Sequence, residues 1–161
     1  MKTLFLVRHA KSDWNNPEIK DIERPLNDRG YNNANAMSKQ LNVHPDVMVT
    51  SPAIRAISTA LIFARNLNHN PNTLLIRKEL YESSVKDYLN VIHQLDNQYE
   101  SAMIFAHNPT ITNFSESLVK SIPQEMPTCC IVGIRFECSK WEDLKKTGEL
   151  FLFDYPKRGE N

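Results

Sequence analysis

The sequence contains only four glycines, and they lie far apart at positions 30, 133, 148 and 159. A P-loop or a dinucleotide-binding fingerprint needs several glycines at short, fixed spacings, so both kinds of nucleotide site are excluded. Any phosphate that the protein binds must therefore be held by side chains. The carboxylate–histidine spacing of metal hydrolases, such as H-E-x-x-H, is also absent, so we expect no metal site and no cofactor.

Cysteines and long apolar runs are equally scarce. The three cysteines, Cys129, Cys130 and Cys138, are odd in number and lack C-x-x-C spacing, which is typical of reduced, buried thiols in a cytoplasmic protein. No apolar run approaches the length of a membrane span, and the one near the N-terminus ends at Arg8 and His9, too early for a signal peptide. We therefore expect a cytoplasmic protein that does not bind membranes.

Neither sign of charge is in excess, since Lys plus Arg and Asp plus Glu each number 19. Without a global basic field, we expect no nucleic-acid partner. The 161 residues, 41% of them hydrophobic, are enough to bury a substantial core. The simplest organisation is a single domain spanning residues 1–161.

Short apolar runs alternate with amphipathic segments along the chain. Residues 11–28 are polar, contain two prolines and are expected to form a long loop, while Ser51 and Pro52 are predicted as the N-cap and first position of a helix. The alternation predicts an α/β fold, a three-layer sandwich with a mixed, mostly parallel central sheet and helices on both faces. The predicted strands are 4–7, 46–50, 73–76, 102–106, 131–136 and 149–153, and the predicted helices are 29–41, 52–67, 85–95 and 109–119.

Residues that can do chemistry follow three of the predicted strands. Arg8 and His9 end the first strand, Arg55 follows the second within a Ser-Pro-x-x-Arg sequence, and His107 ends a later one. The carboxyl ends of parallel strands meet at one edge of a sheet, so these four side chains are expected to converge there. Two arginines and two histidines without a carboxylate favour a bound dianion, because arginine matches phosphate oxygens with paired hydrogen bonds. The residues therefore predict a phosphate-ester or phosphoramidate site.

Four segments stand out in order along the chain: residues 6–15 (LVRHAKSDWN), 24–30 (RPLNDRG), 50–56 (TSPAIRA) and 106–109 (AHNP). Together they resemble the signature of the histidine phosphatase superfamily, which includes the cofactor-dependent phosphoglycerate mutases. The Arg-His-Ala and His-Asn-Pro sequences and the short chain are similar to the SixA-like phosphohistidine phosphatase branch. The resemblance implies a phosphoglycerate mutase-like fold.

The resemblance also implies roles for the converging side chains. His9 would accept the phosphoryl group while Arg8, Arg55 and His107 surround its oxygens, and water would then hydrolyse the phosphohistidine. We expect the arginines to lower the pKa of His9, and its second ring nitrogen to donate to a backbone carbonyl. The first loop adds two candidate phosphate contacts and a predicted loop anchor: Ser12, Asn15 and Trp14.

The proton donor is less well defined. In the family it is an acidic residue after the third strand, where Glu79 and Glu82 lie here, and Asp13 and Asp21 of the first loop are rivals. We choose Glu82. An imidazole leaving group has a pKa of about 6.5, so cleavage of a phosphorus–nitrogen bond makes little demand on an acid.

The resulting hypothesis is a metal-independent phosphatase with a covalent phosphohistidine intermediate on His9, acting on phosphohistidine of a partner protein. The connections at residues 67–79 and 95–102 are short, which predicts an open rim without lid segments. An open rim could admit a protein surface and disfavours a mutase. Two alternatives stay open: a phosphatase of a small phosphorylated metabolite, and a non-catalytic phosphate-binding module.

Overall fold

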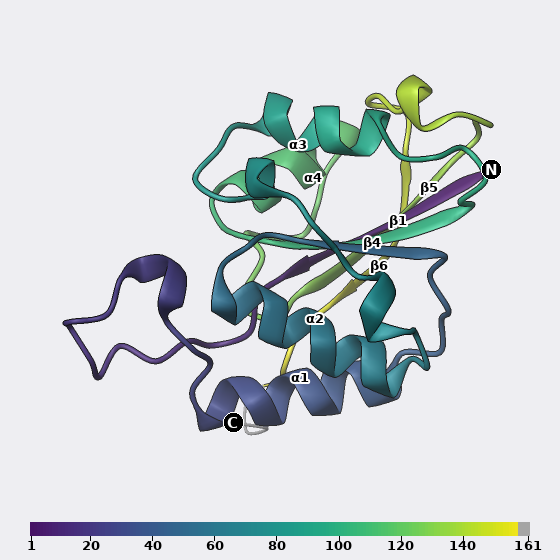
Figure 1. Cartoon of the computed structure of the whole chain (residues 1–161). Coiled ribbons are helices and arrows are strands. Elements are labelled where there is room, and N and C mark those ends of the chain that lie inside the picture. The colour runs from purple at the N-terminus through teal and green to yellow at the C-terminus, as the bar shows by residue number, and fades with distance from the viewer. Residues whose placement is uncertain (158–161) are drawn as a thin grey trace.

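Six strands form one sheet, in the order β3-β2-β4-β1-β5-β6. We describe it from a computed structural model, which covers residues 1–157 (Figure 1). The strands are β1 (Lys2–Arg8), β2 (Val47–Thr50), β3 (Leu75–Ile76), β4 (Ser101–Ala106), β5 (Ile131–Phe136) and β6 (Glu149–Asp154). The helices are α1 (Asp28–Gln40), α2 (Ile54–Asn66), α3 (Val85–His93) and α4 (Thr110–Leu118), with short 3-10 turns between them.

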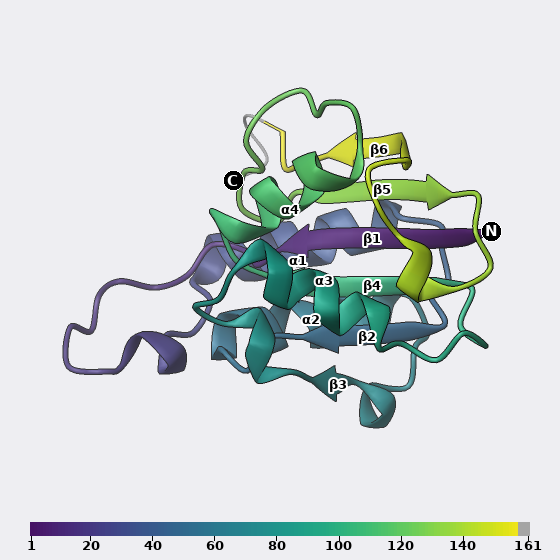
Figure 2. The ribbon, with the colours of Figure 1, turned by 90° about the horizontal axis from the view of Figure 1, so that it is seen from above.

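The sheet is mixed, as predicted. Strands β1 to β4 are parallel, whereas β5 runs antiparallel to β1 and β6 runs antiparallel to β5. Figure 2 shows the strands side by side, with β1 and β4 in the middle. Residues 4–7 of β1 and 102–106 of β4 are apolar without interruption, as expected for central strands that helices cover on both faces.

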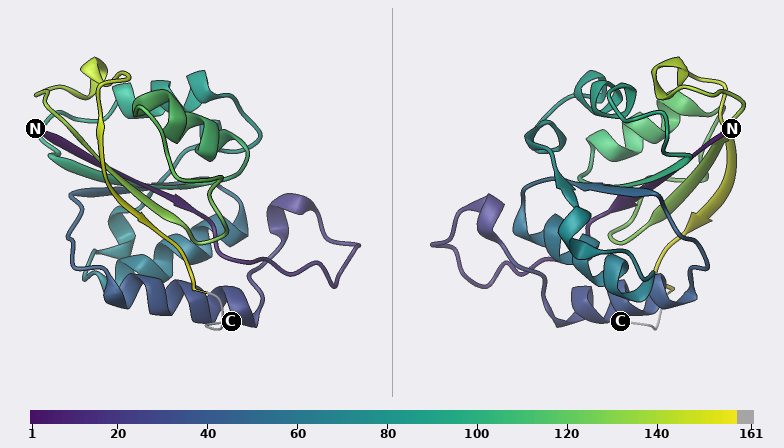
Figure 3. Two further views of the ribbon diagram at one scale, coloured as in Figure 1. Left: turned by 180° about the vertical axis from the view of Figure 1, so that it is seen from behind. Right: turned by 45° about the vertical axis from the view of Figure 1, so that its right-hand side comes forward.

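Alternate residues of β1 point into two separate cores. Leu4 and Leu6 pack with Tyr88 of α3 in one core, while Phe5 and Val7 pack with side chains of α1 and α2 in the other. Helices α1 and α2 cover one face of the sheet, and α3 and α4 cover the opposite face (Figure 3). The predicted three-layer sandwich is therefore confirmed.

The start of α2 differs from the prediction. The helix begins at Ile54 with Ala53 as its N-cap, and no side chain caps it. Ser51 is fully buried, and its hydroxyl accepts a hydrogen bond from the backbone N–H of Ala53 and lies against the ring of His107. Ser51 therefore contacts His107 across the sheet and does not cap α2.

The carboxyl ends of β1, β2 and β4 lie together at one edge of the sheet. Arg8 of β1 pairs with Ala106 of β4, and Thr50 of β2 pairs with Phe105 of β4. The loop between β1 and α1 projects from this edge (dark violet, left in Figure 1). Among residues 1–157, none of the helices has both the length and the apolar character to span a bilayer.

Candidate active site

His9 follows β1 directly, and 8% of its surface is exposed. Its Nδ1 lies 2.7 Å from the carbonyl oxygen of Ala10, which can only accept, so the neutral ring donates from Nδ1 and leaves Nε2 unprotonated. Burial lowers the pKa of His9 to about 3, and the charges of Arg55 and Arg8 act in the same direction against the Ala10 carbonyl. The arginines, which were predicted to cause this shift in pKa, contribute less to it than burial does. At neutral pH the ring is uncharged, and Nε2 carries a lone pair.

His107 lies beside His9, with ring centroids 5.1 Å apart. Its Nε2 is 2.7 Å from the hydroxyl oxygen of Ser51. Because that oxygen already accepts from Ala53, the hydroxyl hydrogen can be donated to Nε2, and His107 then carries its own hydrogen on Nδ1. Nδ1 is buried and has no hydrogen-bond partner within residues 1–157. Burial and the neighbouring His9 lower the pKa of His107 to about 3.

Two arginines bring permanent positive charge to the histidines. Nη1 of Arg8 donates to the carbonyl oxygen of Met126 (2.8 Å), which fixes its guanidinium at the end of β1. Arg55, in the first turn of α2, is 6% exposed. The Nε atoms of both arginines are buried and unpaired in the part of the chain that the structure describes. The site therefore holds donors that the protein itself leaves unused.

A carboxylate from the first loop joins the cluster, although none was expected within the motifs. Asp21 accepts hydrogen bonds from Arg55 (3.0 Å), Arg24 (3.1 Å) and the Tyr81 hydroxyl (2.6 Å). Burial alone would raise the pKa of Asp21, but these three donors outweigh it and hold the pKa well below its usual range. Asp21 is therefore ionised at neutral pH. It was considered above as a proton donor, and a lowered pKa makes a carboxyl group less suited to donating a proton at neutral pH.

Arg24 is a third arginine at the site, and the predicted set did not include it. It is 7% exposed, and its Nη1 donates to the hydroxyl of Ser12. Its guanidinium also stacks on the ring of Trp14, with Cζ 3.5 Å from the ring centroid. The signal was present in the Arg-Pro-Leu segment, which was used only to recognise the family and the start of a helix.

The first loop is held against α1 at its base. Asn27 caps α1, with its side chain accepting from the N–H of Gly30, and its own N–H donates to the carbonyl oxygen of Lys11 (3.1 Å). A Cβ atom built on Gly30 would lie 2.1 Å from that same carbonyl oxygen. Only glycine allows the helix to approach the loop so closely.

These side chains surround a cavity of about 280 Å³ at the carboxyl edge of the sheet. The predicted residues Arg8, His9, Ser12, Arg55 and His107 line it, together with Lys11, Trp14, Arg24, Asn108 and Thr128. Asn15 is exposed and is not among the lining residues; its backbone N–H donates to the carboxylate of Asp13. The structure thus brings together every predicted phosphate contact except Asn15.

Glu82 lies at a second, adjoining cavity of about 240 Å³. Arg55, His107 and Asn108 belong to both cavities, and Glu82, Asp21, Tyr81, Ser83, Tyr88, Pro109 and Thr110 complete the second one. The Glu82 side chain is exposed, and after burial and Asp21 its charge also helps to raise the pKa of the Tyr81 hydroxyl. Glu82 therefore lies at the cavity beside His107. It does not line the first cavity, which we call the cation-rich cavity because three arginines and a lysine line it.

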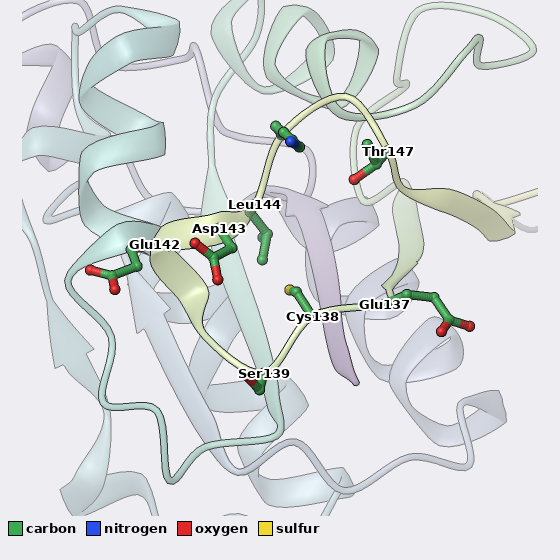
Figure 4. A pocket seen from close by; sticks show the side chains of 8 residues that line it. Glu137, Cys138, Ser139, Glu142, Asp143, Leu144 and Thr147 are labelled. Carbon is green, nitrogen blue, oxygen red and sulfur yellow. The ribbon is translucent and has the colours of Figure 1, made fainter.

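A larger hollow of about 760 Å³ lies at the opposite edge of the sheet, after β5 (Figure 4). Three acidic side chains line it, Glu137, Glu142 and Asp143, but none of the residues predicted from the motifs does. Across residues 1–157, no group of three or more His, Cys, Asp or Glu side chains is placed to hold a metal ion. The side chains that the motifs predicted to take part in chemistry therefore lie at the carboxyl edge of the sheet.

Comparison with known proteins identifies the family of the chain. The family model for the histidine phosphatase superfamily (branch 1) matches residues 4–104. A curated protein of Hydrogenobacter thermophilus, named "Putative phosphoserine phosphatase 2", is 28% identical over 123 residues, which cover 74% of this chain and 56% of that protein. The chain thus spans little more than half the length of this relative.

Solved structures share the whole fold. The "putative phosphohistidine phosphatase SixA" of Agrobacterium tumefaciens has a TM-score of 0.81 at 23% identity, covering 97% of this chain and 99% of its own. The protein histidine phosphatase SixA complexed with tungstate has a TM-score of 0.80 at 21% identity, with coverages of 96% and 97%. A mycobacterial glucosyl-3-phosphoglycerate phosphatase has a TM-score of 0.68 at 14% identity, with coverages of 92% and 96%.

Proposed function

The chain belongs to the histidine phosphatase superfamily, and from its site we propose that it hydrolyses a phosphoryl group through a covalent intermediate on His9, without a metal ion. One observation carries this proposal. Nε of Arg8, Nε of Arg55 and Nδ1 of His107 are buried and lack partners within residues 1–157, beside a neutral His9. A buried donor without a partner costs about 1–3 kcal/mol, and the oxygens of a phosphoryl group would satisfy all three.

The first step forms a bond between Nε2 of His9 and phosphorus. The bond from phosphorus to the leaving group breaks, and its electron pair goes to the leaving group. Nδ1–H of His9 stays bonded to the Ala10 carbonyl and stabilises the charged phosphohistidine. Because Arg8, Arg55 and His107 are already in place, they stabilise the transferring phosphoryl without rearranging.

In the second step, water attacks phosphorus and the bond to Nε2 breaks, which releases phosphate and neutral His9. We assign Glu82 the proton transfers, first to the leaving group and then from the attacking water. Its position supports this assignment, since it borders the histidine cluster at the adjoining cavity. Asp21, the other carboxylate there, is held ionised by Arg55, Arg24 and Tyr81.

Phosphohistidine of a partner protein is the substrate that we propose. Two exposed side chains of the first loop, Lys11 and Trp14, line the cation-rich cavity, so a protein surface could contact its rim. An imidazole leaving group has a pKa of about 6.5, so its departure makes little demand on a proton donor.

A small phosphorylated metabolite is the second candidate. The adjoining cavity favours it, because Tyr81, Ser83 and Thr110 add polar groups beside His107 that could hold a small polar leaving group. The names of two relatives, which refer to phosphoserine and to glucosyl-3-phosphoglycerate, are consistent with such substrates in the superfamily.

The proposal is tested by offering the purified protein phosphohistidine-bearing proteins, phosphoserine and a set of sugar phosphates. We expect hydrolysis to persist in chelator and to vanish in His9→Ala. The control is His69→Ala, which alters a histidine of the loop after α2 that does not line the cavity. Acid-labile phosphate trapped on the wild-type protein but not on His9→Ala would identify the intermediate. No hydrolysis of any phosphate would leave only a phosphate-binding module, and faster hydrolysis of metabolites would replace the partner protein as substrate.

A further inference from the structure

Beyond the phosphoryl cavity itself, we propose that Trp14 receives a planar ring of the leaving group and so determines substrate specificity. This inference rests on the proposed phosphatase function and names the class of substrate for the same site. The class is a phosphoryl group carried on a planar ring, such as the imidazole of phosphohistidine.

The exposure of Trp14 is the first observation. The chain has two tryptophans; Trp141 is fully buried, whereas Trp14 is 73% exposed. A loop anchor, as the sequence suggested, would be buried against the protein. Trp14 instead lines the cavity that contains His9, so its exposed surface lies at the entrance to the site. Large aromatic surfaces left exposed beside a cavity mark sites of recognition.

The second observation is that the ring is fixed before any ligand arrives. Arg24 stacks on it with Cζ 3.5 Å from the ring centroid, and Arg24 is itself buried and held by Asp21 and Ser12. One face of the indole is therefore occupied by a guanidinium that cannot easily move away. The rest of the ring surface remains available to a ligand.

The backbone on either side of Trp14 is also tied down. The N–H of Asp13 donates to the carbonyl oxygen of Pro25 (2.8 Å), Ser12 forms an isolated antiparallel bridge with Leu26, and the carboxylate of Asp13 accepts from the N–H of Asn15. A ring held in this way loses little conformational entropy when a ligand covers it, so contact with it adds to affinity.

The chemistry of the ring selects the class of ligand. Two planar aromatic groups attract one another beyond simple burial of area, and the adjacent guanidinium also favours a π-system. An alkyl leaving group gains neither effect. Trp14 thus favours aryl or imidazole phosphoryl donors over alkyl phosphates, a preference that phosphate binding by Arg8 and Arg55 cannot supply.

A binding comparison tests the proposal without requiring turnover. Phenylphosphonate and methylphosphonate share the phosphoryl group and differ in the ring, and calorimetry measures the affinity of each. We expect the wild type to bind phenylphosphonate about fivefold more tightly, Trp14→Phe to retain this preference and Trp14→Ala to abolish it. Tyr31→Ala, which removes an exposed aromatic ring that does not line the cavity, is the matched control and should retain the preference.

Two outcomes of the binding comparison overturn the proposal. The first is equal affinity of the wild type for both phosphonates. The second is an equal loss of affinity in Trp14→Ala for phenylphosphonate, methylphosphonate and inorganic phosphate, which would mean that Trp14 only positions Arg24. Because these measurements record binding, a protein without phosphatase activity would still give a result, and failure of the proposed function would appear only in the hydrolysis experiment.

A second readout identifies the ring. Acrylamide quenching of fluorescence reports on Trp14, since Trp141 is fully buried, and phenylphosphonate should protect it whereas methylphosphonate should not. In turnover, Trp14→Ala should lower kcat/KM about fivefold for phosphoimidazole and far less for methyl phosphate. An equal loss of kcat/KM for phenyl phosphate would mean that Trp14 accepts any planar ring. A loss for phosphoimidazole alone would mean that Trp14 accepts only imidazole. An equal loss for methyl phosphate would contradict the proposal.

Discussion

Ser51 and His107 are joined across the sheet, with 2.7 Å between the serine hydroxyl oxygen and Nε2 of the imidazole. Ser51 follows β2 and His107 follows β4, and these strands are hydrogen-bonded neighbours. With the serine hydroxyl donating to Nε2, His107 carries its hydrogen on Nδ1, the buried atom that we propose binds a phosphoryl oxygen.

Replacing Ser51 by alanine should impair this arrangement. Without the hydroxyl donor, Nε2 loses its partner and the hydrogen of His107 can move to it, so we expect Ser51→Ala to lower kcat about tenfold. Ser38→Ala is the control, because Ser38 is also fully buried and bonded to a helix carbonyl but lies in α1. Similar kcat values for the two variants in a steady-state assay would remove Ser51 from the mechanism.

The two histidines should make stability depend on pH. Burial lowers the pKa of His9 and of His107 to about 3, whereas the unfolded chain takes up protons on them near pH 6.5. Between these values the unfolded state binds more protons, so stability is present above about pH 6.5 and is lost as the pH falls towards 3. His9→Gln should reduce the slope of unfolding free energy against pH by about 1 kcal/mol per pH unit near pH 5. Urea unfolding at pH 4.5, 5.5 and 6.5 measures both slopes, and equal slopes would refute the shift.

Asp21 should show a pH effect at lower pH. Its pKa is lowered in the folded protein, so its stabilising contribution is present above the unfolded value near 4 and is lost as the pH falls below it. The Asp21 side chain is 45% exposed, so after allowance for solvent screening we expect Asp21→Asn to cost about 1 kcal/mol at pH 7. The difference from wild type should shrink between pH 4 and pH 2 in urea unfolding. A difference that stayed constant with pH would mean that charge is not its cause.

Arg24 should contribute to phosphate affinity. Its buried guanidinium lines the cavity, and hydrogen bonds from a charged donor are worth more than neutral ones. We expect Arg24→Ala to weaken binding of inorganic phosphate about ten- to a hundredfold in calorimetry. Arg65→Ala removes an exposed arginine of α2 away from the cavity and should leave the affinity as in wild type. Equal affinities in both variants would show that Arg24 only supports the loop.

Gly30 should be sensitive to a single methyl group. Because a Cβ there would meet the carbonyl oxygen of Lys11, we expect Gly30→Ala to push residues 11 and 12 aside, to cost about 1–3 kcal/mol of stability and to lower activity. Asn32→Ala, at an exposed position two residues further along α1, should instead leave activity intact and stabilise slightly. Thermal unfolding and kcat/KM of the two variants test this. A Gly30→Ala variant as stable as wild type would contradict the close approach.

The sequence predicted the fold and the centre of the site because both depend on local patterns. Strands and helices have their own periodicities, and His9 and His107 could be placed because each directly follows an apolar run. The ion pair of Asp21 with Arg55 and the contact of Ser51 with His107 were not predicted, because these partners lie 34 and 56 residues away in the sequence. Nothing local distinguishes Asp21, in a polar loop, from its neighbours. The dominant effect of burial on the pKa of His9 likewise emerges only when both cores are assembled.

The pairing of β1 with β4 has a consequence for how such a site can diversify. Arg8 pairs with Ala106, and the N–H of His9 donates to the Ala106 carbonyl, so the two histidines leave adjacent strands at the same level. Their ring centroids lie 5.1 Å apart, close to the spacing of about 4.8 Å between neighbouring strands. The hydrogen-bonded pairing of β1 with β4 therefore sets the distance between the two imidazoles. Loops at the rim can lengthen, shorten or change composition, and so admit different molecules, while the distance between the two imidazoles stays the same.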